Sequence, residues 1–224
     1  MSSIFRRALG ADFDRLHPEI QRRFGFSSAD GVASIGEGVM EELWRGPAFT
    51  VPFLVLGTWR RIMFPERGRD VPFRIENYAY VDGFGRETVT WARTFDLPRR
   101  TRRFDATMTW SEQRSCIVDY LGTHQHLAVD LHASVDGEGG IRFRSGEQRF
   151  YERRIAFRFP LVLSGAAEVG EWYDDEEQRF RISVEVGNAR FGRLFGYRGW
   201  FHAEELPCSD VPRHVKPVRE EQRE

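Results

Sequence analysis

The stretch Arg179-Phe-Arg-Ile-Ser-Val-Glu-Val186 decides the fold class, because apolar and polar residues alternate along it without a break. A period of two is typical of a β-strand that presents one face to a core and the other face to water. The same alternation recurs in three earlier stretches, at residues 104–110, 127–132 and 154–161. The sequence therefore predicts several half-buried strands.

Turn signals separate the predicted strands from Val71 onward. Asp-Gly pairs, which favour tight hairpin turns, occur at Asp82-Gly83 and Asp136-Gly137, and polar turns are predicted at residues 174–177 and 187–189. This spacing gives roughly nine or ten strands, too many for one flat sheet. We predict an α+β protein, mainly β, with a strongly curved antiparallel sheet or barrel and N-terminal helices packed on or into it.

Two short helices are predicted in the first 25 residues. Ser3 can cap a helix over residues 4–9, and Pro18 favours the first turn of a second helix over residues 19–24. Apolar residues also recur at spacings of three and four, which predicts a helical stripe laid on a larger apolar surface; they are Phe13, Leu16, Ile20 and Phe24.

A first strand at residues 39–44 and a further helix are predicted next. The helix starts at Thr50 with Pro52 in its first turn and runs to about Met63. Its apolar face is broad and arginines follow it, so it could lie on a membrane surface. The bulky residues suit burial against the concave side of a curved sheet at least as well, and we expect burial.

Composition and charge exclude several classes of protein. The 224 residues are 41% hydrophobic, enough for a core, and the formal net charge of −1 provides no global attraction to nucleic acid. No run approaches the roughly 18 apolar residues of a spanning helix, so we expect no integral membrane association. The N-terminus lacks signal-peptide features, and two cysteines make no disulfide framework, which predicts a cytoplasmic protein.

We expect one curved-sheet domain over residues 1–205. The remaining residues, 206–224, contain three prolines and end in a charged run, which predicts a flexible charged tail.

Several short segments resemble a bacterial family of uncharacterised domains that occur alone or fused to proteins like short-chain or saccharopine dehydrogenases. These segments are Leu16 to Phe24, Thr90 to Phe95, Ile117 to Gly122, Gly170 to Asp175 and Phe195 to Phe201. The resemblance covers most of the chain and supplies no catalytic residues. It implies an independent domain that sometimes works beside a reductase. This chain has no Gly-rich dinucleotide fingerprint, so a reductase would be a separate partner.

Polar residues embedded in aromatic strands are the candidate catalytic groups. In a barrel some of them must point inward, where an apolar cavity raises the pKa of a carboxyl group and makes it useful for acid–base chemistry. The candidates are Arg93, Asp119, Glu171 and Tyr197. An internal ion pair that fixes strand register is the structural alternative. Candidate ligand-binding residues are aromatic: Trp59, Trp91, Phe95, Tyr120, Trp172 and Tyr173.

Two further clusters have both a binding and a structural interpretation. His124 and His126 are spaced to point both imidazoles at one metal, but no convincing third ligand follows, and we predict a solvated strand face or hairpin tip and no metal. The arginines at positions 99, 100, 102 and 103 could grip an anion or a partner, and a solvated hairpin loop is the alternative.

Three functions fit these features. The first is a domain that binds a lipid-, polyketide- or terpenoid-like molecule in an aromatic-lined cavity. The second is a cofactor-independent isomerase or cyclase, in which Glu171 or Asp119 moves a proton and Arg93 or Tyr197 stabilises negative charge. The third is an accessory subunit of a short-chain-dehydrogenase-like reductase, with a filled core. No cofactor and no nucleic acid are expected in any of them.

Overall fold

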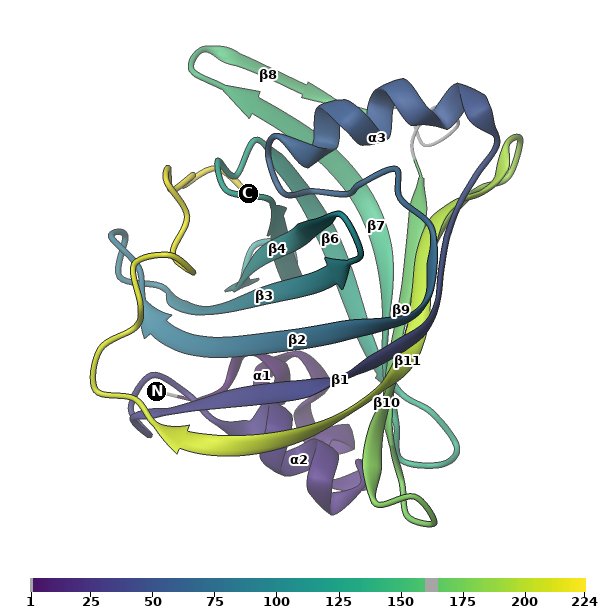
Figure 1. The fold of residues 1–224 in the computed structure, drawn as a ribbon. Coiled ribbons are helices and arrows are strands. Elements are labelled where there is room, and N and C mark those ends of the chain that lie inside the picture. The colour runs from purple at the N-terminus through teal and green to yellow at the C-terminus, as the bar shows by residue number, and fades with distance from the viewer. Residues whose placement is uncertain (1, 160–164) are drawn as a thin grey trace.

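Ten antiparallel strands close into a barrel in the part of the chain that the structure describes (Figure 1). The structure is a computed structural model and describes residues 2–159 and 165–224. The barrel strands are β1 (Val32–Arg45), β2 (Gly68–Val81), β3 (Glu87–Leu97), β4 (Arg100–Ser111), β5 (Cys116–Leu121), β6 (Leu127–Val135), β7 (Ile141–Glu152), β9 (Ala166–Asp174), β10 (Arg179–Asn188) and β11 (Gly192–Pro207). The predicted curved antiparallel sheet or barrel is confirmed.

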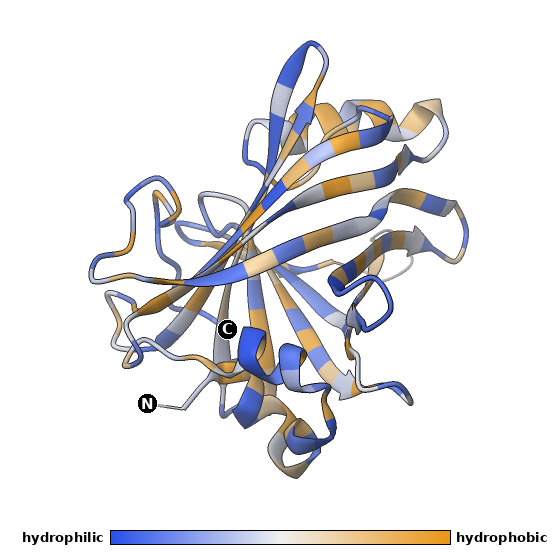
Figure 2. Ribbon diagram, turned by 60° about the horizontal axis from the view of Figure 1, so that its bottom comes forward, coloured by the Kyte–Doolittle hydropathy of each residue, from blue (hydrophilic) through white to orange (hydrophobic). Residues whose placement is uncertain are grey.

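Two pairings between non-consecutive strands close the barrel: β1 pairs with β11, and β7 pairs with β9. On its other edge β7 forms a hairpin with β6. The short strand β8 (Ile155–Arg158) pairs with the end of β7 and projects beyond the rim. The predicted strand at residues 154–161 is therefore present in its first half, and Pro160 and Leu161 lie outside the described residues. Figure 2 shows apolar and polar residues alternating along the strands.

The N-terminal helices cover one end of the barrel, as predicted. They are α1 (Ile4–Leu9), η1 (Gly10–Arg15) and α2 (Pro18–Gly25). Ser3 Oγ accepts the Phe5 N–H at 3.2 Å, and His17 Nδ1 accepts the Glu19 N–H at 3.2 Å, so each α-helix starts at a side-chain cap. The predicted apolar stripe is buried: Phe13, Leu16, Ile20 and Phe24 are at most 3% exposed. We call this covered side the closed end.

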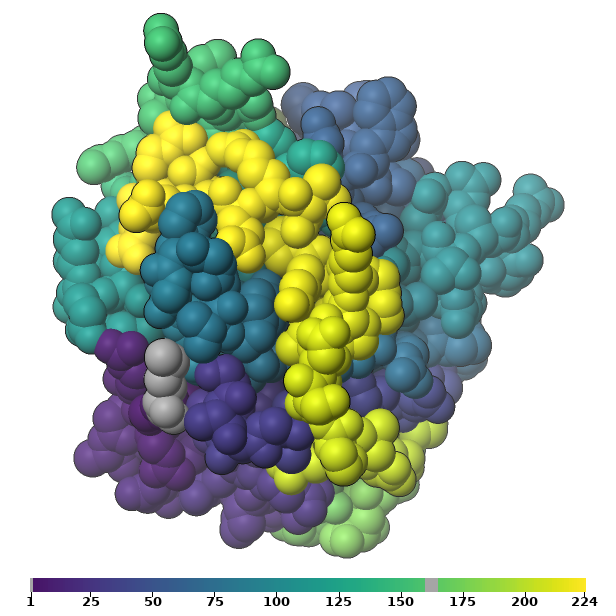
Figure 3. Space-filling model, turned by 90° about the vertical axis from the view of Figure 1, so that its left-hand side faces the viewer, coloured from purple at the N-terminus to yellow at the C-terminus, as the bar shows by residue number. Residues whose placement is uncertain are grey.

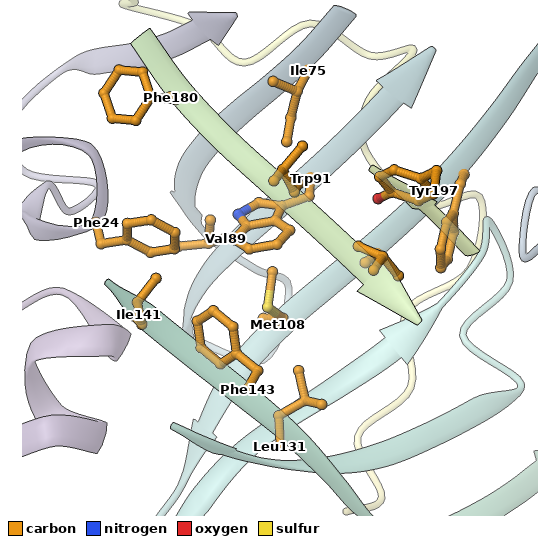
Figure 4. Packing of buried hydrophobic residues seen from close by; sticks show 14 of the residues in the cluster. Phe24, Ile75, Val89, Trp91, Met108, Leu131, Ile141, Phe143, Phe180 and Tyr197 are labelled. Atoms are coloured by element: carbon orange, nitrogen blue, oxygen red, sulfur yellow. The ribbon is translucent and has the colours of Figure 1, made fainter. Parts of the chain in front are cut away.

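Aromatic rings fill the interior beneath these helices. Trp91 of β3, Phe24 of α2 and Phe143 of β7 are mutual neighbours, with ring centroids 5.8 to 6.1 Å apart (Figure 4). Phe5 of α1 contacts all three rings and lies 4.9 Å from Phe24. Buried apolar area contributes about 25 cal/mol per Å², so this ring cluster is a principal source of stability at the closed end.

The helix after Thr50 differs from its prediction in length and in burial. It is α3 (Val51–Thr58), preceded by the 3-10 turn η2 (Ala48–Thr50), and it ends one turn before Met63. The chain reverses there because Arg61 takes a left-handed φ of 56° and the Ile62 N–H donates to the Gly57 carbonyl at 3.0 Å. The Thr50 hydroxyl does not cap the helix and donates instead to the Pro47 carbonyl.

Burial of this helix was predicted wrongly. Only Leu54 is buried, whereas Phe53 and Leu56 are 75% and 62% exposed and the following Trp59 is 78% exposed. The helix lies across the other end of the barrel (Figure 1). Apolar residues surround its axis, so a single line of contact with the barrel leaves most of them in solvent. We call this side the open end.

The segment after Pro207 lies along the outer wall of the barrel (Figure 3). Val215 is 3% exposed and packs with Tyr78 of β2, and the Val218 N–H donates to the Thr123 carbonyl at 2.7 Å. β11 extends two residues past the predicted domain boundary at residue 205. The flexibility predicted for residues 206–224 stays a prediction. No helix within the described residues is long and apolar enough to cross a bilayer.

Candidate functional site

A cavity of about 590 Å³ occupies the half of the barrel nearer the open end. Its floor is the Trp91 and Phe143 cluster, and its roof is η2 and α3 with Phe49, Phe53 and Leu54. Its volume lies inside the usual 300 to 1,000 Å³ range of small-molecule sites. A barrel with buried aromatic clusters and such a cavity is compatible with small-molecule binding.

Apolar side chains make up most of the cavity wall, because the inward positions of the strands alternate with outward ones. The inward apolar residues include Phe104 and Met108 of β4, Leu127, Val129 and Leu131 of β6, Val169 of β9 and Val184 of β10. Polar groups are few: Arg93, Asp119, Thr50, Ser145 and Gln148. A polar group of a bound molecule would therefore find few hydrogen-bond partners in this cavity.

Arg93 is one of these polar groups and is held rigidly on β3. It is 3% exposed, and its guanidinium carbon lies 3.8 Å from the centre of the Phe104 ring. Nε donates to the Phe104 carbonyl at 3.2 Å, and Nη1 donates to the Tyr197 hydroxyl at 3.0 Å. Nη2 has no hydrogen-bond partner among the described residues, so the guanidinium offers a donor to a ligand.

Asp119 enters the same cavity from β5, in register with Met108 and Val129. It is 7% exposed, and its Oδ1 atom is buried without a hydrogen-bond partner among the described residues. Burial raises the pKa of Asp119 to about 7, and the positive charge of Arg93 opposes this shift only in part. Near neutral pH the carboxyl group can thus accept or donate a proton.

Glu171 faces inward on β9 but lies outside the cavity lining. It is fully buried and forms an ion pair with Arg23 of α2, whose Nη1 also donates to Ser34 Oγ at 2.8 Å. Burial raises the pKa of Glu171, and Arg23 opposes the shift. This pair joins the N-terminal helices to the barrel wall. It is an internal ion pair, as in the structural alternative, but it holds a helix in place and does not fix strand register.

Tyr197 holds the Arg93 side chain in place from outside the cavity lining. It is fully buried on β11, accepts a hydrogen bond from Arg93 and packs on Phe95 with ring centroids 5.0 Å apart. Burial raises the pKa of its hydroxyl, so the phenol stays protonated. It positions Arg93 and does not line the cavity.

The aromatic residues predicted to bind a ligand do not form one wall and lie in several parts of the structure. Trp91 lines the cavity, whereas Phe95 is buried outside its lining and packs on Phe64, Phe73 and Tyr197. Tyr173 points inward at the closed end, where its ring stacks on His17 at 5.0 Å. Trp59 lies exposed at the open end, so it is not part of the wall.

Tyr120 and Trp172 do not line the cavity. Tyr120 clusters with Val118, Ala128 and Tyr151 on the outer side of the wall, and its hydroxyl donates to the Arg223 carbonyl at 3.0 Å. Trp172 lies 6.0 Å from the guanidinium of Arg142 on the outer face. Each is next in sequence to an inward residue, Asp119 or Glu171, and neighbours on a strand face opposite sides.

Sequence reasoning did not single out Arg23, Ser145 and Gln148. Arg23 is 2% exposed in a helix that also carries the exposed Arg22, and only the helical stripe beside it could have indicated burial. Ser145 and Gln148 of β7 both face the cavity although they are three positions apart. Val129 and Leu131 of β6 pair with Gln148 and Ser145, so β7 has one extra residue at this point of the ladder. This irregularity shifts the inward–outward alternation of β7 between Ser145 and Gln148.

The two histidines and the arginine cluster lie at the open end, outside the cavity. His124 and His126 stack at 5.6 Å in the β5–β6 loop, and the described residues contain no group of three or more metal-ligating side chains. In the arginine cluster, Arg102 bonds Glu66 at 2.6 Å, and Arg103 bonds Asp105 of the same strand and donates to the His214 carbonyl at 3.3 Å. These two arginines therefore join β4 to the segment after α3 and to the C-terminal segment.

Comparison with known proteins places the chain in a family. The profile of a domain of unknown function, DUF4166, matches residues 16–201, which is most of the chain. The chain belongs to this family. Uncharacterized protein YndH of Bacillus subtilis (strain 168) is 32% identical over 205 residues, covering 92% of this chain and 98% of that protein. The segments that carry the resemblance in the sequence all fall inside the matched range.

Proposed function

We propose that this protein binds an apolar small molecule of the lipid, polyketide or terpenoid type in the cavity at the open end of the barrel. The observation that carries the proposal is a 590 Å³ space with a mostly apolar wall and two buried ionisable groups, Arg93 and Asp119. Removing an apolar molecule from water into such a space is favourable by about 25 cal/mol per Å² of apolar surface.

The two polar groups indicate the chemistry of the ligand. Arg93 offers a free donor at Nη2, and Asp119, with a pKa of about 7, carries a donor O–H in its neutral form. A ligand group that accepts both hydrogen bonds, a carbonyl or a carboxylate, complements this pair. The ligand we propose is therefore an apolar chain or ring system with one such oxygen group.

A titration with cis-parinaric acid, a fluorescent polyene fatty acid, tests the proposal. We expect saturable binding at one site and its loss in Ala167→Phe, because Ala167 lines the cavity and a phenyl group would fill it. Ala156→Phe is the matched control, since Ala156 is exposed on β8. Equal binding by the wild type and by Ala167→Phe, or no saturable binding by either, would contradict the proposal.

Native mass spectrometry of the protein from its own host identifies the natural ligand. An apolar adduct that is released on denaturation, and that Ala167→Phe does not carry, supports the proposal. An adduct retained by the filled-cavity variant places binding elsewhere and contradicts it.

A second function, cofactor-independent proton transfer by an isomerase or cyclase, is favoured by one observation. The Asp119 carboxyl group lies in the cavity without a hydrogen-bond partner among the described residues, and its pKa is about 7. In this role Asp119 would take a proton from a carbon next to the ligand carbonyl, and Arg93 would stabilise the negative oxygen.

Deuterium exchange separates this function from simple binding. The compound extracted from the protein is returned to it in D₂O, and carbon-bound deuterium is followed by mass spectrometry. Catalysis predicts uptake with the wild type and none with Asp119→Asn, although the variant still binds the compound. Absence of uptake with the wild type leaves binding as the function. The accessory-subunit hypothesis expected a filled core, so the cavity gives it no support.

A further inference from the structure

The open end of the barrel gathers most of the exposed apolar side chains. The described residues expose twelve large apolar side chains, and eight of them lie here: five between residues 49 and 59, Ile155 and Phe157 of β8, and Phe191. The remaining four are scattered over the rest of the surface. Figure 1 shows α3 and β8 side by side at this end. We call these eight residues the apolar rim.

The apolar rim surrounds the opening of the cavity. Phe49, Phe53 and Phe191 line the cavity and are also 50%, 75% and 39% exposed, so the cavity reaches the surface between them. The rings of Phe49 and Phe191 pack on each other at this edge of the cavity, with ring centroids 5.5 Å apart. Exposed apolar clusters of this size are rare on proteins, and where they occur they mark a surface that binds a partner, a ligand or a membrane.

Charge is sorted along the barrel axis although the whole chain is nearly neutral. The described connections at the open end carry nine arginines and one acidic residue, Glu66; they are residues 46–67, 97–100, 122–126, 153–159, 165 and 189–191. The four hairpin turns at the closed end carry seven acidic residues and two arginines; they are residues 82–86, 112–115, 136–140 and 175–178. The N-terminal helices that cover this end, over residues 4–25, add three acidic residues and five arginines. The open end is therefore strongly basic, whereas the closed end carries a small acidic excess.

Several open-end arginines are available to a partner. The side chains of Arg153 and Arg158 are 92% and 74% exposed although they pair with Glu152 and Glu147. Arg99 is exposed at the β3–β4 turn. Arginine on the rim of an apolar patch is the arrangement of segments that lie in the interface of an anionic bilayer, with apolar groups below the headgroups and guanidinium groups among them.

The rim is held firmly enough to act as one surface. The segment after α3 is fixed to the barrel because the Thr123 N–H donates to the Arg60 carbonyl at 2.9 Å and the Asp105 N–H donates to the Arg61 carbonyl at 2.8 Å. Gly122 permits this contact, since a Cβ atom there would meet the Arg60 carbonyl oxygen at 2.2 Å. α3 thus presents Phe53, Leu56 and Trp59 outward while its end is anchored.

We propose that the open end of the barrel docks on the surface of an anionic lipid bilayer, with the apolar rim in the interface and the surrounding arginines at the headgroups. Trp59, the most exposed residue of the rim, is of the type enriched at membrane interfaces. Docking in this orientation points the cavity opening at the lipid, so an apolar ligand would pass between bilayer and cavity without crossing water. Docking itself does not depend on a ligand in the cavity.

Vesicle co-sedimentation without any added ligand tests this proposal. We expect binding to vesicles of equal parts phosphatidylglycerol and phosphatidylcholine, and binding weaker by about tenfold or more to phosphatidylcholine alone or at high salt, because anionic headgroups attract the arginines. The triple variant Phe53→Ser/Leu56→Ser/Trp59→Ser should lose binding by about tenfold or more, since each side chain contributes apolar area.

Matched controls separate docking from damage to the fold. Val81→Ser/Phe84→Ser removes exposed apolar side chains near the closed end and should bind vesicles like the wild type. Arg99→Glu/Arg153→Glu should weaken binding to anionic vesicles, whereas Arg144→Glu, on an exposed part of the wall, should not. Trp59→Phe should retain binding but lose most of the fluorescence quenching by brominated lipids.

Three results would overturn the proposal. These are no binding of the wild type to anionic vesicles, binding that the triple variant retains, and a dimer in solution that the triple variant converts to monomer without any vesicle binding by the wild type. The last result would make the rim a contact between copies of this chain. The parinaric acid titration contains no vesicles, so it fails or succeeds independently of this test.

Discussion

The two halves of the barrel interior differ in how completely apolar side chains fill them and in whether their buried carboxyl group has a partner. At the closed end the helices press an amphipathic stripe onto the barrel, rings fill the interior, and the buried carboxylate Glu171 is paired with Arg23. At the open end α3 covers the barrel with one buried residue, 590 Å³ stays unfilled, and the buried carboxyl group of Asp119 has no hydrogen-bond partner among the described residues. The packed rings and the ion pair of the closed half stabilise the fold. The open half instead has an unfilled cavity and a carboxyl group that a ligand could contact.

Breaking the ion pair of the closed half should have the largest effect. Arg23→Met leaves Glu171 as an unpaired buried charge and should lower the free energy of unfolding by about 3–5 kcal/mol, measured by urea denaturation. The double variant Arg23→Met/Glu171→Met removes both charges and should recover most of this loss. A loss below about 1 kcal/mol for the single variant would mean that the pair does not hold the helices on the barrel.

Replacing the unpaired carboxyl group of the open half should have an effect that depends on pH. Because the pKa of folded Asp119 is about 7, above its value of 3.8 when unfolded, the folded state binds more protons between these values, and wild-type stability falls as pH rises through this window. Relative to the wild type, Asp119→Asn should gain up to about 4 kcal/mol between pH 4 and pH 8. Urea denaturation at several pH values measures this, and a constant difference would contradict the raised pKa.

The same group should make binding depend on pH. The ionised Asp119 carboxylate repels a ligand carboxylate, so the affinity for cis-parinaric acid should fall by about tenfold as pH rises through 7. In Asp119→Asn this pH dependence should disappear. An equal dependence in the two proteins would assign the titration to the ligand or to another group.

Adding volume should distinguish the filled half from the empty half. Ala79→Phe, in the packed part of β2, should cost about 1–3 kcal/mol through overpacking, whereas Ala167→Phe should be neutral or stabilising by about 1 kcal/mol because it enters open space. Thermal or urea denaturation of both variants makes the comparison. Equal destabilisation by the two substitutions would show that the open half is closely packed.

The smallest effect is expected on the outer face of α3. Phe53→Ser should change the free energy of unfolding by less than about 0.5 kcal/mol, because the phenyl ring is already 75% exposed, whereas Phe24→Ala at the closed end should cost about 3–5 kcal/mol. A cost above about 2 kcal/mol for Phe53→Ser would show that α3 packs more tightly than its exposure indicates.

The sequence predicted the parts of this molecule that depend on local period. Alternation indicated the strands and the barrel, and the cap at Ser3 and the first-turn proline Pro18 placed the N-terminal helices correctly. The same rule should have shown that Asp119 and Tyr120 cannot both face the cavity, since neighbouring strand residues point to opposite sides. The predicted site therefore mixed inward residues with outward ones.

The exposure of α3 and the pairing of Glu171 could not be predicted locally. An apolar helix is buried only where packed side chains meet it, and the space below α3 depends on strands brought together by barrel closure. Glu171 lies 148 positions from Arg23, its partner. Both features are set by tertiary contacts that leave no periodic signal in the sequence.

The most direct test of the difference between the two halves is a methyl NMR titration with cis-parinaric acid in the absence of vesicles. The cavity-lining methyl groups of Leu131 and Val184 should shift in a saturable manner, and the methyl groups of Val71 and Ile75, which are buried outside the cavity, should move little. Shifts confined to exposed residues such as Val218, or no saturable shift at all, would contradict a binding site in the open half of the barrel.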